Sequence, residues 1–403
     1  MAHPKILAFI LAGGKGERLF PLTVDRSKPA VPFGGRYRIV DFVLSNFVNS
    51  NIFSIYLLIQ YKSQSLIEHI RQNWVLSPVI PDHFVALVPP QMRMGPEWFQ
   101  GTADAIFQNL NLIKTHKPEL VAIFGADHIY RMDIRQMVDF HITSDAYATV
   151  AAIPVPLDEA SSFGIIRCDK NGKISGFDEK PDKPKSMPGR SDAALASMGN
   201  YIFNTDFLID SLAKAQKSKE HDFGKHILPN LVSTERLYTY DFSKNEIPGM
   251  MSYEEEGYWR DVGTISAYFN AQKDMLGERP KLELGNELWP IHPSYSKNTS
   301  ARIFNGFIKN SHIAEGVIIK NARIVNSVIR KGVTIDDDVE IENSIIMDNT
   351  VIRKEVHIKN AIIDKWNVIK KGTSIGFDEK KDRFIVHIDE SGLRVMPRGK
   401  GQK

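Results

Sequence analysis

Apolar residues follow two different patterns along the chain. In the first, from Ile6 to about Leu276, short apolar runs alternate with segments of helical spacing. The runs "KILAFILA", "IFSIYLLI", "LVAIFGA" and "AYATVAAI" are typical of buried strands, and residues 63–74 and 103–114 are typical of helices. Such an alternation predicts a largely parallel sheet covered by helices on both faces. Ligands bind these sheets beyond the carboxyl ends of the strands.

In the second pattern, after about Glu287, isoleucines recur every five or six residues with Asn, Asp, Gly and Lys between them. Helical spacing cannot produce this period, and hairpin strands would alternate more tightly. A repeat of about six residues is the signature of a parallel β-helix, here expected to be left-handed, in which each short strand stacks its inward side chain on the coil below. The repeating positions are Ile313, Ile319, Ile324, Ile329, Ile335, Ile341, Ile346, Ile352, Ile358, Ile363, Ile369 and Ile375.

The two patterns predict two domains. Residues 1–280 would form a Rossmann-like α/β domain, and residues 281–403 a hexapeptide-repeat β-helix, with a linker at about 278–298 that contains Pro and Gly. Because a stack of coils leaves open ends and flat faces, we expect the β-helix to contact another subunit. The β-helix is either a structural spacer or a regulatory domain.

The composition is that of a globular protein. Of 403 residues, 42% are apolar and 25% are charged, and the net charge is only +3. Without a long Lys and Arg block, nucleic acid is not an expected partner. No run approaches the roughly 18 apolar residues of a membrane helix, so we expect a cytoplasmic protein without a membrane partner. The single cysteine, Cys168, excludes an internal disulfide and a Cys-cluster zinc site.

The segment "LAGGKGERLFPLTVDRSKP" has the residues of an anion-binding loop. Its three glycines directly follow the first strand: Gly13, Gly14 and Gly16. Glycines there let the backbone approach a ligand and direct N–H groups toward it. The P-loop and the G-x-G-x-x-G fingerprint are both absent. Arg18, Arg26 and Lys28 follow, so the loop would bind a polyphosphate. The alternative is a glycine turn with solvated charges.

A candidate metal ligand follows a later strand. Asp127 comes after "LVAIFGA", which puts a carboxylate at a strand's carboxyl end. Mg²⁺ takes one or two carboxylates together with phosphate oxygens and water. A lone Asp in this position is more often a helix cap or turn former, the role that we expect for Asp133. No histidine falls in a metal-binding spacing, and His128 is expected to orient the loop beside Asp127.

Residues 11–42, "LAGGKGERLFPLTVDRSKPAVPFGGRYRIVDF", resemble the signature of the sugar-phosphate nucleotidylyltransferases, within them most of all the adenylyltransferases that act on glucose 1-phosphate. The motifs "WFQGTADA", "DHIYRMD", "SSFGII", "DEKP", "ASMGNYIF", "HDFGK" and "YWRDVGT" follow in the family's order. The resemblance implies that ATP and glucose 1-phosphate give ADP-glucose and pyrophosphate for glycogen or starch synthesis. It also implies Mg²⁺, a homotetramer and regulation by a small anionic effector.

The resemblance further implies residue roles. Arg18, Lys28 and Asp127 would be catalytic, the two cations facing the β- and γ-phosphates, and Asp127 and Asp261 would bind Mg²⁺. The nucleotide would be bound by Leu11, Ala12, Gly13, Gly14, Gly16, Gly101 and Thr102. Glucose 1-phosphate would be bound by Phe99, Gly164, Glu179, Lys180, Ser197, Tyr201 and Asp222. Lys180 would bind the phosphate and Glu179 the hydroxyls. Because side chains alternate along an extended segment, this requires a bend or a ligand that lies across it.

Several positions depart from the family pattern. Ala126 stands where relatives commonly have Gly, so a positive φ there would misdirect the next carboxylate. Glu17 adds a negative charge beside the phosphate loop, and His226 replaces an acidic residue. Phe99 is Tyr in some relatives, so a contact through that hydroxyl would be missing. Asp25 stands where some relatives have a lysine that binds an activating sugar bisphosphate, so we do not expect activation by fructose 1,6-bisphosphate.

Three other functions are compatible with parts of the sequence. The same chemistry could use another nucleotide and sugar phosphate pair. The chain could be a catalytically silent regulatory subunit, but such paralogues usually lose phosphate-loop cations or metal carboxylates, and these residues are all retained here. Acyl transfer by the β-helix would need a base among the coils, where only His312 and His357 are candidates and neither is in a recognisable site.

Overall fold

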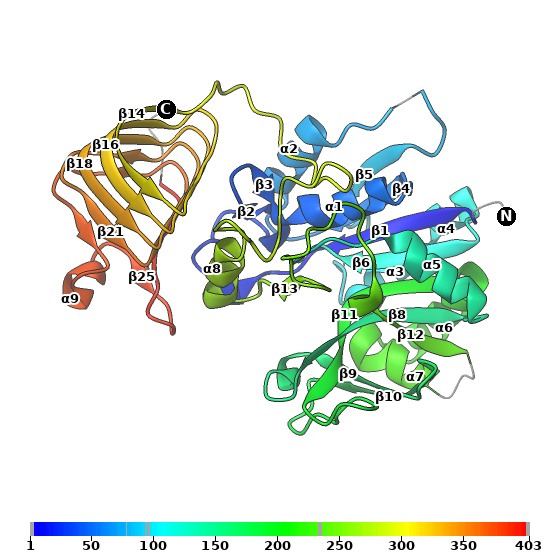
Figure 1. Cartoon of the computed structure of the whole chain (residues 1–403). Helices are drawn as coiled ribbons and strands as arrows, with labels where there is room; N and C mark the ends of the chain where they lie inside the picture. The colour runs from blue at the N-terminus through cyan, green and yellow to red at the C-terminus, as the bar shows by residue number, and fades with distance from the viewer. Residues whose placement is uncertain (1–3, 78, 93–94, 96, 233–235, 400–403) are drawn as a thin grey trace.

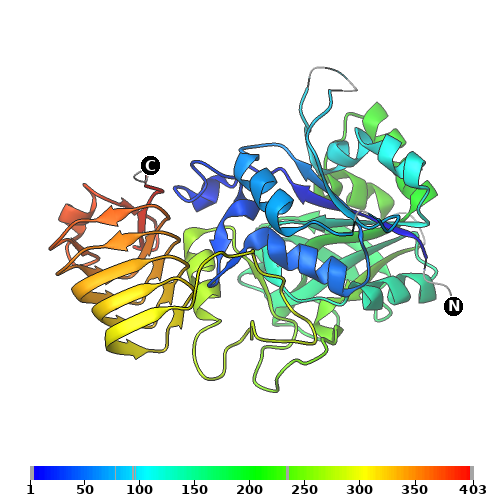
Figure 2. The same cartoon turned by 90° about the horizontal axis from the view of Figure 1, so that it is seen from above.

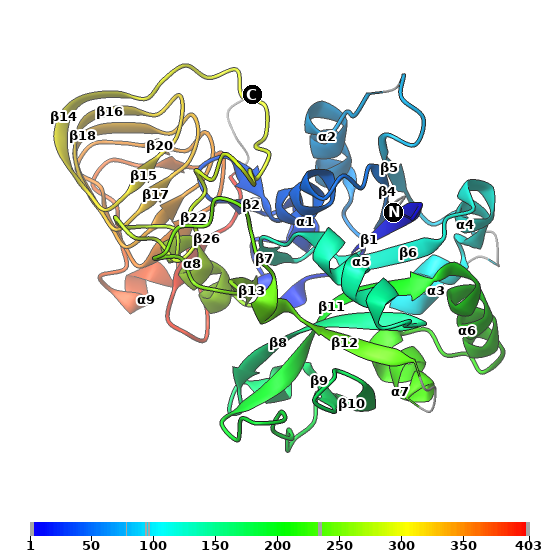
Figure 3. The ribbon, with the colours of Figure 1, turned by 45° about the vertical axis from the view of Figure 1, so that its right-hand side comes forward.

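The computed structural model describes residues 4–77, 79–92, 95, 97–232 and 236–399. Figures 1 and 3 show a sheet flanked by helices, built from the first part of the chain, and a coil of short strands, built from the last part, packed against one end of it. This arrangement confirms the predicted fold class, a mostly parallel α/β domain followed by a left-handed parallel β-helix. No helix in the described part of the chain is long and apolar enough to cross a membrane.

A nine-stranded mixed sheet forms the centre of the first part. Strand β1 pairs in parallel with β4 and β6, and β4 pairs in parallel with β5. Strand β11 runs antiparallel to β6, β8 and β9, whereas β12 pairs in parallel with β8, so the far half of the sheet is mixed. The strands are β1 (Ile6–Ala12), β4 (Ser54–Ile59), β5 (Phe84–Val88), β6 (Leu120–Gly125), β8 (Ala148–Pro156), β9 (Gly164–Cys168), β10 (Ile174–Glu179), β11 (Ala193–Asn204) and β12 (Leu237–Asp241).

Helices cover both faces of this sheet, as the continuous apolar strands predict. Alternate residues of β1 enter different cores: Ala8 and Ile10 pack with one set of helices, and Leu7 and Phe9 with another. The first set is α1 (Ile39–Asn49), α2 (Gln64–Asn73) and α5 (Ile134–Thr143). The second set is α3 (Thr102–Phe107), α4 (Leu110–His116), α6 (Thr205–Lys217) and α7 (Leu228–Leu231).

The helix predicted over residues 103–114 is wrong as a single element, because α3 and α4 are separate helices. The break lies at Asn109, whose side-chain amide donates a hydrogen bond of 2.8 Å to the carbonyl of Ala105. In a continuous helix that carbonyl would accept from the backbone N–H of Asn109, which instead donates to Ile106. The local competition of an Asn side chain therefore ends the helix.

In the β-helix the isoleucine period becomes three vertical stacks. Ile313, Ile329, Ile346 and Ile363 are partners in one ladder. A second ladder holds Ile319, Ile335, Ile352 and Ile369, and a third Ile324, Ile341, Ile358 and Ile375. The strands are β14 (Arg302–Lys309), β15 (His312–Ile313), β16 (Ile318–Val325), β17 (Val328–Ile329), β18 (Thr334–Glu342), β19 (Ile345–Ile346), β20 (Val351–Ile352), β21 (His357–Lys359), β22 (Ala361–Ile363), β23 (Val368–Ile369) and β24 (Ser374–Ile375).

The chain ends with a short cap on the coil. It consists of α9 (Glu379–Asp382), β25 (His387–Ile388) and β26 (Arg394–Met396), and β26 continues the ladder after β22. Seen from above in Figure 2, the coil lies at one end of the molecule and the N-terminus at the other.

The β-helix and the α/β part share one apolar core and several buried polar contacts. Phe33 in β2 (Pro32–Phe33), next to β3 (Tyr37–Arg38), packs in one cluster with α8 (Ile265–Lys273) and with Val328 of the β-helix. Buried Arg330 donates hydrogen bonds to the carbonyls of Phe33, at 2.7 Å, and Gly34. Buried Arg26 pairs with Asp364. The β-helix is therefore joined directly to the segment that follows the glycine loop.

Candidate active site

A cavity of about 870 Å³ opens beyond the carboxyl ends of β1 and β6, where an α/β sheet places its ligands. It collects residues from motifs that lie far apart in the sequence. Every residue that the resemblance assigned to catalysis, nucleotide, sugar phosphate or metal lines it: Leu11, Ala12, Gly13, Gly14, Gly16, Arg18, Lys28, Phe99, Gly101, Thr102, Asp127, Gly164, Glu179, Lys180, Ser197, Tyr201, Asp222 and Asp261. The structure thus brings the whole predicted set together, although their individual roles stay predictions.

The glycine loop closes over Lys28. Gly16 has a φ of 64°, a left-handed conformation that favours glycine, and its carbonyl accepts a 2.9 Å hydrogen bond from the Thr23 hydroxyl. A Cβ at position 16 would lie 3.0 Å from the Cβ of Lys28, so a larger residue would push the loop away. The glycine is therefore needed both for the turn and for contact with the lysine beneath it.

Lys28 lies between two carboxylates. Its Nζ is 3.0 Å from Oδ2 of Asp127 and 2.9 Å from Oδ1 of Asp261, and its side chain is only 8% exposed. Burial lowers the pKa of Lys28, but the two carboxylates outweigh burial and raise the pKa above its usual value. Burial likewise raises the pKa of Asp127, but Lys28 and His128 hold it below its usual range. The ammonium and the Asp127 carboxylate are both charged at neutral pH.

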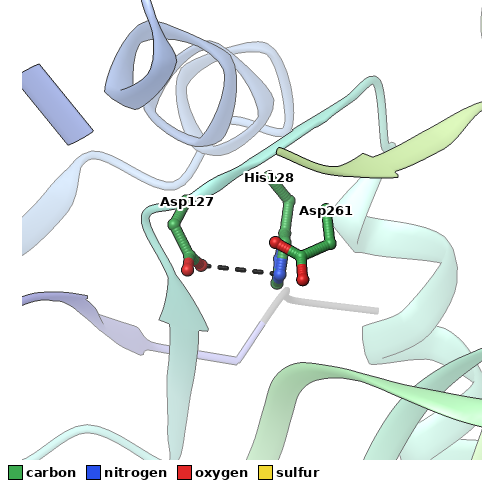
Figure 4. Close-up of side chains that lie close together, drawn as sticks. All are labelled: Asp127, His128 and Asp261. Carbon is green, nitrogen blue, oxygen red and sulfur yellow. Dashed lines mark ion pairs between the residues drawn. The ribbon is translucent and has the colours of Figure 1, made fainter. Parts of the chain in front are cut away.

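A short antiparallel pair of strands brings the two acids together. Strand β13 (Trp259–Asp261) pairs with β7 (His128–Tyr130), so that Asp261 lies opposite His128, the neighbour of Asp127. Figure 4 shows the two carboxylates and the imidazole pointing into one space. Ligand atoms of Asp127, His128 and Asp261 lie within 4.8 Å of one another. This donor set can hold a divalent cation, since carboxylate oxygens are the ligands that such hard cations prefer.

His128 contacts both the acid and the neighbouring strand. Its Nε2 is 3.5 Å from Oδ1 of Asp127, and its ring lies 4.9 Å from that of Trp259. These contacts fit the predicted orienting role, which stays a prediction, while the ring is also near enough to both acids to be a third ligand. Asp133 caps α5, as predicted, because its side chain accepts from the backbone N–H of Arg135.

Arg18 adds a second cation at the loop. It belongs to the 3₁₀ turn Glu17–Leu19 and is exposed. Its guanidinium lies against Gly263, where an added Cβ would come within 2.9 Å of Nη2. Glu17, the departure that adds a negative charge, is exposed and lies 3.8 Å from the ammonium of Lys15. The charge of Glu17 therefore has a cationic neighbour of its own.

The chain bends at Lys180, as the binding of one ligand by both Glu179 and Lys180 requires. Strand β10 ends at Glu179, and Lys180 adopts a φ of 48°, so successive side chains no longer alternate across a strand. The Lys180 ammonium is 4.0 Å from Oε1 of Glu179, and its side chain is 59% exposed. The pKa of Glu179 is raised above its usual value, because burial outweighs the lowering effect of the Lys180 charge and the negative charge of Asp222 raises the pKa further. Both side chains can therefore face a single ligand in the cavity.

Asp222 and Thr102 join two walls of the cavity. The Thr102 hydroxyl donates to Oδ2 of Asp222 at 3.1 Å and accepts from the backbone N–H of Phe223 at 2.9 Å. Asp222 also caps the π-helical turn Phe223–Ile227 through the N–H of Lys225. Next to them, a Cβ on Gly101 would clash with the carbonyl of His221. This glycine is thus required by a protein contact, a reason that the sequence did not reveal.

Tyr201 and Ser197 lie on β11 at the floor of the cavity. Tyr201 is buried, and burial together with Asp222 raises the pKa of its phenol despite a hydrogen bond with Ser197, so it is a neutral donor at physiological pH. The Ser197 hydroxyl also accepts from the N–H of Gly199 at 3.3 Å. These hydroxyls are suited to a polar ring such as a sugar.

Two of the departures from the family pattern, Ala126 and His226, lie close to the site acids Asp127 and Asp222. Ala126 does not adopt a positive φ, so the expected misdirection of Asp127 does not occur. His226 accepts a hydrogen bond of 3.3 Å from the backbone N–H of Asp222.

Gln60 is a cavity residue that no sequence motif singled out. It directly follows β4, and its side chain donates to the carbonyl of Phe99 at 3.2 Å. The rule that ligands lie beyond strand carboxyl ends was signal enough to find it.

Two models of known protein families match the chain and define its class. Residues 7–278 match the family model described as nucleotidyl transferase. Residues 296–396 match the model described as GlmU-like, C-terminal hexapeptide. The first match spans the sheet, the cavity and both acids, and the second spans the coil of isoleucine stacks.

Relatives narrow the class. The chain is 62% identical over 396 residues to the glucose-1-phosphate adenylyltransferase of Thermodesulfovibrio yellowstonii, with 98% of this chain and 96% of the relative covered. It is 49% identical to the enzyme of that name from Anaeromyxobacter dehalogenans, with 98% of both covered. For the one from Thermus thermophilus the values are 46% and 99% of both. The chain belongs to the glucose-1-phosphate adenylyltransferase family of nucleotidyltransferases.

Proposed function

We propose that the protein transfers the adenylyl group of ATP to glucose 1-phosphate, giving ADP-glucose and pyrophosphate for glycogen or starch synthesis. One observation carries the proposal: a single cavity holds the glycine loop, two cations, two acids and the polar residues of the "DEKP", "ASMGNYIF" and "HDFGK" motifs. Sequence identities of 62% and 49% to relatives of that name, each over 98% of this chain, support the choice of nucleotide and sugar.

The reaction needs positive charge more than covalent help. A phosphate oxygen of glucose 1-phosphate attacks the α-phosphorus of ATP, and pyrophosphate leaves with the electron pair of the broken bond. Two anions must meet, so fixed cations are placed where charge gathers. Arg18 and Lys28, which both line the cavity, would contact the β- and γ-phosphates. Leu11, Ala12, Gly13, Gly14, Gly16, Gly101 and Thr102 would bind the nucleotide.

Asp127 and Asp261 would hold Mg²⁺, for which two carboxylates and space for phosphate oxygens are a suitable donor set. Bound there, Mg²⁺ would neutralise charge on the triphosphate. On the sugar side, Lys180 would bind the phosphate and Glu179 the hydroxyls. Phe99, Gly164, Ser197, Tyr201 and Asp222 would complete that subsite.

We also propose that a small anion regulates the enzyme at the junction of the two parts. The support is a basic group contributed by both parts: Arg26, Arg38, Arg330, Lys331, Lys365 and Arg398. Burial and the neighbouring Arg26 and Arg38 lower the pKa of Lys365 to about 7 against the opposing effect of Asp348, so the charge of Lys365 is disfavoured where it lies. Asp25, exposed beside Arg26, still argues against fructose 1,6-bisphosphate. The activity of wild type and Lys365→Gln, measured with and without a small anion, tests this site. The anion should lose its effect on activity in Lys365→Gln, and an unchanged effect would contradict the proposal.

A homotetramer of two-domain subunits is proposed, with domains 1–280 and 281–403. Strand β14 supports self-association, because it is the edge strand of its sheet and carries apolar side chains that are at least half exposed: Ile303, Phe304 and Phe307. Light scattering of wild type and Phe304→Asp tests it, and a monomeric wild type would contradict it. We propose a cytoplasmic location because both substrates are cytoplasmic metabolites.

A substrate-pair assay tests the main proposal. Pyrophosphate release is measured for each combination of ATP, GTP, UTP and dTTP with glucose 1-phosphate, mannose 1-phosphate and N-acetylglucosamine 1-phosphate. The highest kcat/KM is expected for ATP with glucose 1-phosphate. A higher value for any other pair, or binding without turnover, would overturn the proposal.

A further inference from the structure

Lys28 occupies oxygens that a divalent cation would need. Its ammonium contacts one carboxylate oxygen each of Asp127 and Asp261, at 3.0 and 2.9 Å. The proposed function assigns Mg²⁺ to the same two acids. A positive charge already placed between the acids competes electrostatically with any second cation that approaches them.

The accessibility of the three side chains separates this contact from an ordinary buried ion pair. Lys28 is 8% exposed, but Asp127 and Asp261 are 40% and 24% exposed toward the cavity. By contrast, the structural pair of Arg26 and Asp364 is closed on both sides, at 1% and 0%. The two acids therefore keep open faces while the lysine neutralises part of their charge.

The backbone of Lys28 is fixed, whereas its side chain is long and flexible. The 3₁₀ turn Lys28–Ala30 is closed by the N–H of Val31, which donates to the Lys28 carbonyl at 3.0 Å, and Gly16 lies directly over the Lys28 Cβ. The head of a lysine turns on a four-carbon stem with several rotatable bonds. The ammonium can thus exchange one anion for another in the cavity without any movement of the loop.

We propose that Lys28 is an internal counter-cation that keeps free divalent metal away from Asp127 and Asp261 until a triphosphate offers its ammonium another partner. Leaving the acids unpaired would be unfavourable, so Lys28 gives them up only when a cation replaces it and an anion receives it. A metal–triphosphate complex supplies both at once. Lys28 therefore selects the metal–nucleotide complex over the free metal, an inference that rests on the assignment of metal to these acids.

Binding of Mn²⁺, followed by electron paramagnetic resonance with the full-length protein and no nucleotide, tests this selection. Wild type is compared with Lys28→Met, which keeps a stem of the same length but removes the ammonium, and with Lys15→Met, an equal charge change at an exposed lysine of the same loop. Lys28→Met is expected to bind Mn²⁺ about tenfold more tightly than wild type, a difference of about 1.4 kcal/mol, and Lys15→Met to match wild type. Adding Asp261→Asn to Lys28→Met should abolish the gain.

Thermal melting with and without Mn²⁺ keeps the test decisive if Lys28→Met is unstable. The variant should melt below wild type without metal, and Mn²⁺ should raise its melting temperature more than that of wild type. A variant that folds only with Mn²⁺ would also support the proposal. Equal Mn²⁺ affinity and equal melting shifts in wild type and Lys28→Met would overturn it. If wild type still forms ADP-glucose, only this inference fails and the proposed function stands.

Discussion

At the scale of single residues, the proposed chemistry depends most on Asp127, whose carboxylate contacts Lys28 and His128. Asp127→Asn keeps the size of the side chain but removes its charge, so it should weaken both the ion pair with Lys28 and metal binding. We expect kcat to fall by a factor of about 10² to 10³, the usual cost of losing one such electrostatic contact. Pyrophosphate release with saturating Mg²⁺ is the measurement.

The matched control is Asp210→Asn, an exposed acid of α6 outside the cavity lining. Its turnover should equal that of wild type, and both variants should retain cooperative melting. Full activity in Asp127→Asn would contradict the role that we assign to this carboxylate.

Lys180 should act on one substrate only. Its ammonium lies beside Glu179 in the bend after β10, on the sugar side of the cavity. Lys180→Ala should therefore raise KM for glucose 1-phosphate at least about tenfold, a loss of about 1.4 kcal/mol, with little change in KM for ATP. Steady-state kinetics with each substrate varied in turn measures this, with Lys183→Ala, an exposed neighbour, as the control. Similar increases in both KM values would refute the assignment.

Local sequence predicted some site residues but not their contacts. Asp127 could be found because it follows a buried strand. Asp261 could not be found from its own surroundings, since it joins the site only through the pairing of β13 with β7, and only the family motif singled it out. The position of Lys28 between the acids depends on contacts 99 and 233 residues away in the chain. No spacing rule contains such contacts.

At the scale of elements, the isoleucine stacks should carry the stability of the β-helix. Ile335 is fully buried and stacks between Ile319 and Ile352. Ile335→Ala leaves a cavity in the coil and should lower the free energy of unfolding by about 2 to 5 kcal/mol. Because the stack is distant from the catalytic cavity, KM values should stay within about twofold, that is about 0.4 kcal/mol.

Chemical denaturation monitored by circular dichroism measures the change at Ile335. The control is Val368→Ala on β23, whose side chain is nearly half exposed and lies outside the proposed β14 surface. A loss at Ile335 no larger than that at Val368 would contradict the stacking of Ile335.

Element types could be predicted from the pattern, but element direction could not. The apolar runs located β1, β4, β6 and β8, and the period of about six residues located the coil with its three stacks. Antiparallel β11 was not anticipated, because an apolar run reads the same in either direction. The end of α3 was missed because it depends on one side-chain hydrogen bond of Asn109.

At the scale of the whole molecule, Lys365 should make the stability of the junction depend on pH. Its pKa is about 7 in the folded chain, because burial and the neighbouring Arg26 and Arg38 disfavour its charge. An unfolded lysine has a pKa of about 10.4, so between these values the unfolded state binds more protons. The free energy of unfolding should therefore rise from pH 7 to pH 10, by at most about 1.4 kcal/mol per pH unit from this group.

Lys365→Met removes that contribution. Below pH 7 Lys365 is charged in both the folded and the unfolded state of wild type, but only the folded state buries that charge, so the variant should be the more stable protein there. Its advantage should shrink as pH rises toward 10. Denaturant unfolding at pH 6, 8 and 9.5 gives the comparison, with exposed Lys370→Met as the control. If the difference in free energy of unfolding between wild type and Lys365→Met did not change with pH, the charge of Lys365 would not be disfavoured in the folded state.

The central claim is that the triphosphate lies in the glycine loop, where Arg18, Lys28 and a metal held by Asp127 and Asp261 oppose its charge. A crystal structure with a non-reactive ATP analogue, Mg²⁺ and glucose 1-phosphate tests it most directly. We predict β- and γ-phosphates on the loop within hydrogen-bond distance of both cations, with the sugar phosphate at Lys180. A triphosphate bound elsewhere, or a metal away from the two acids, would contradict the account.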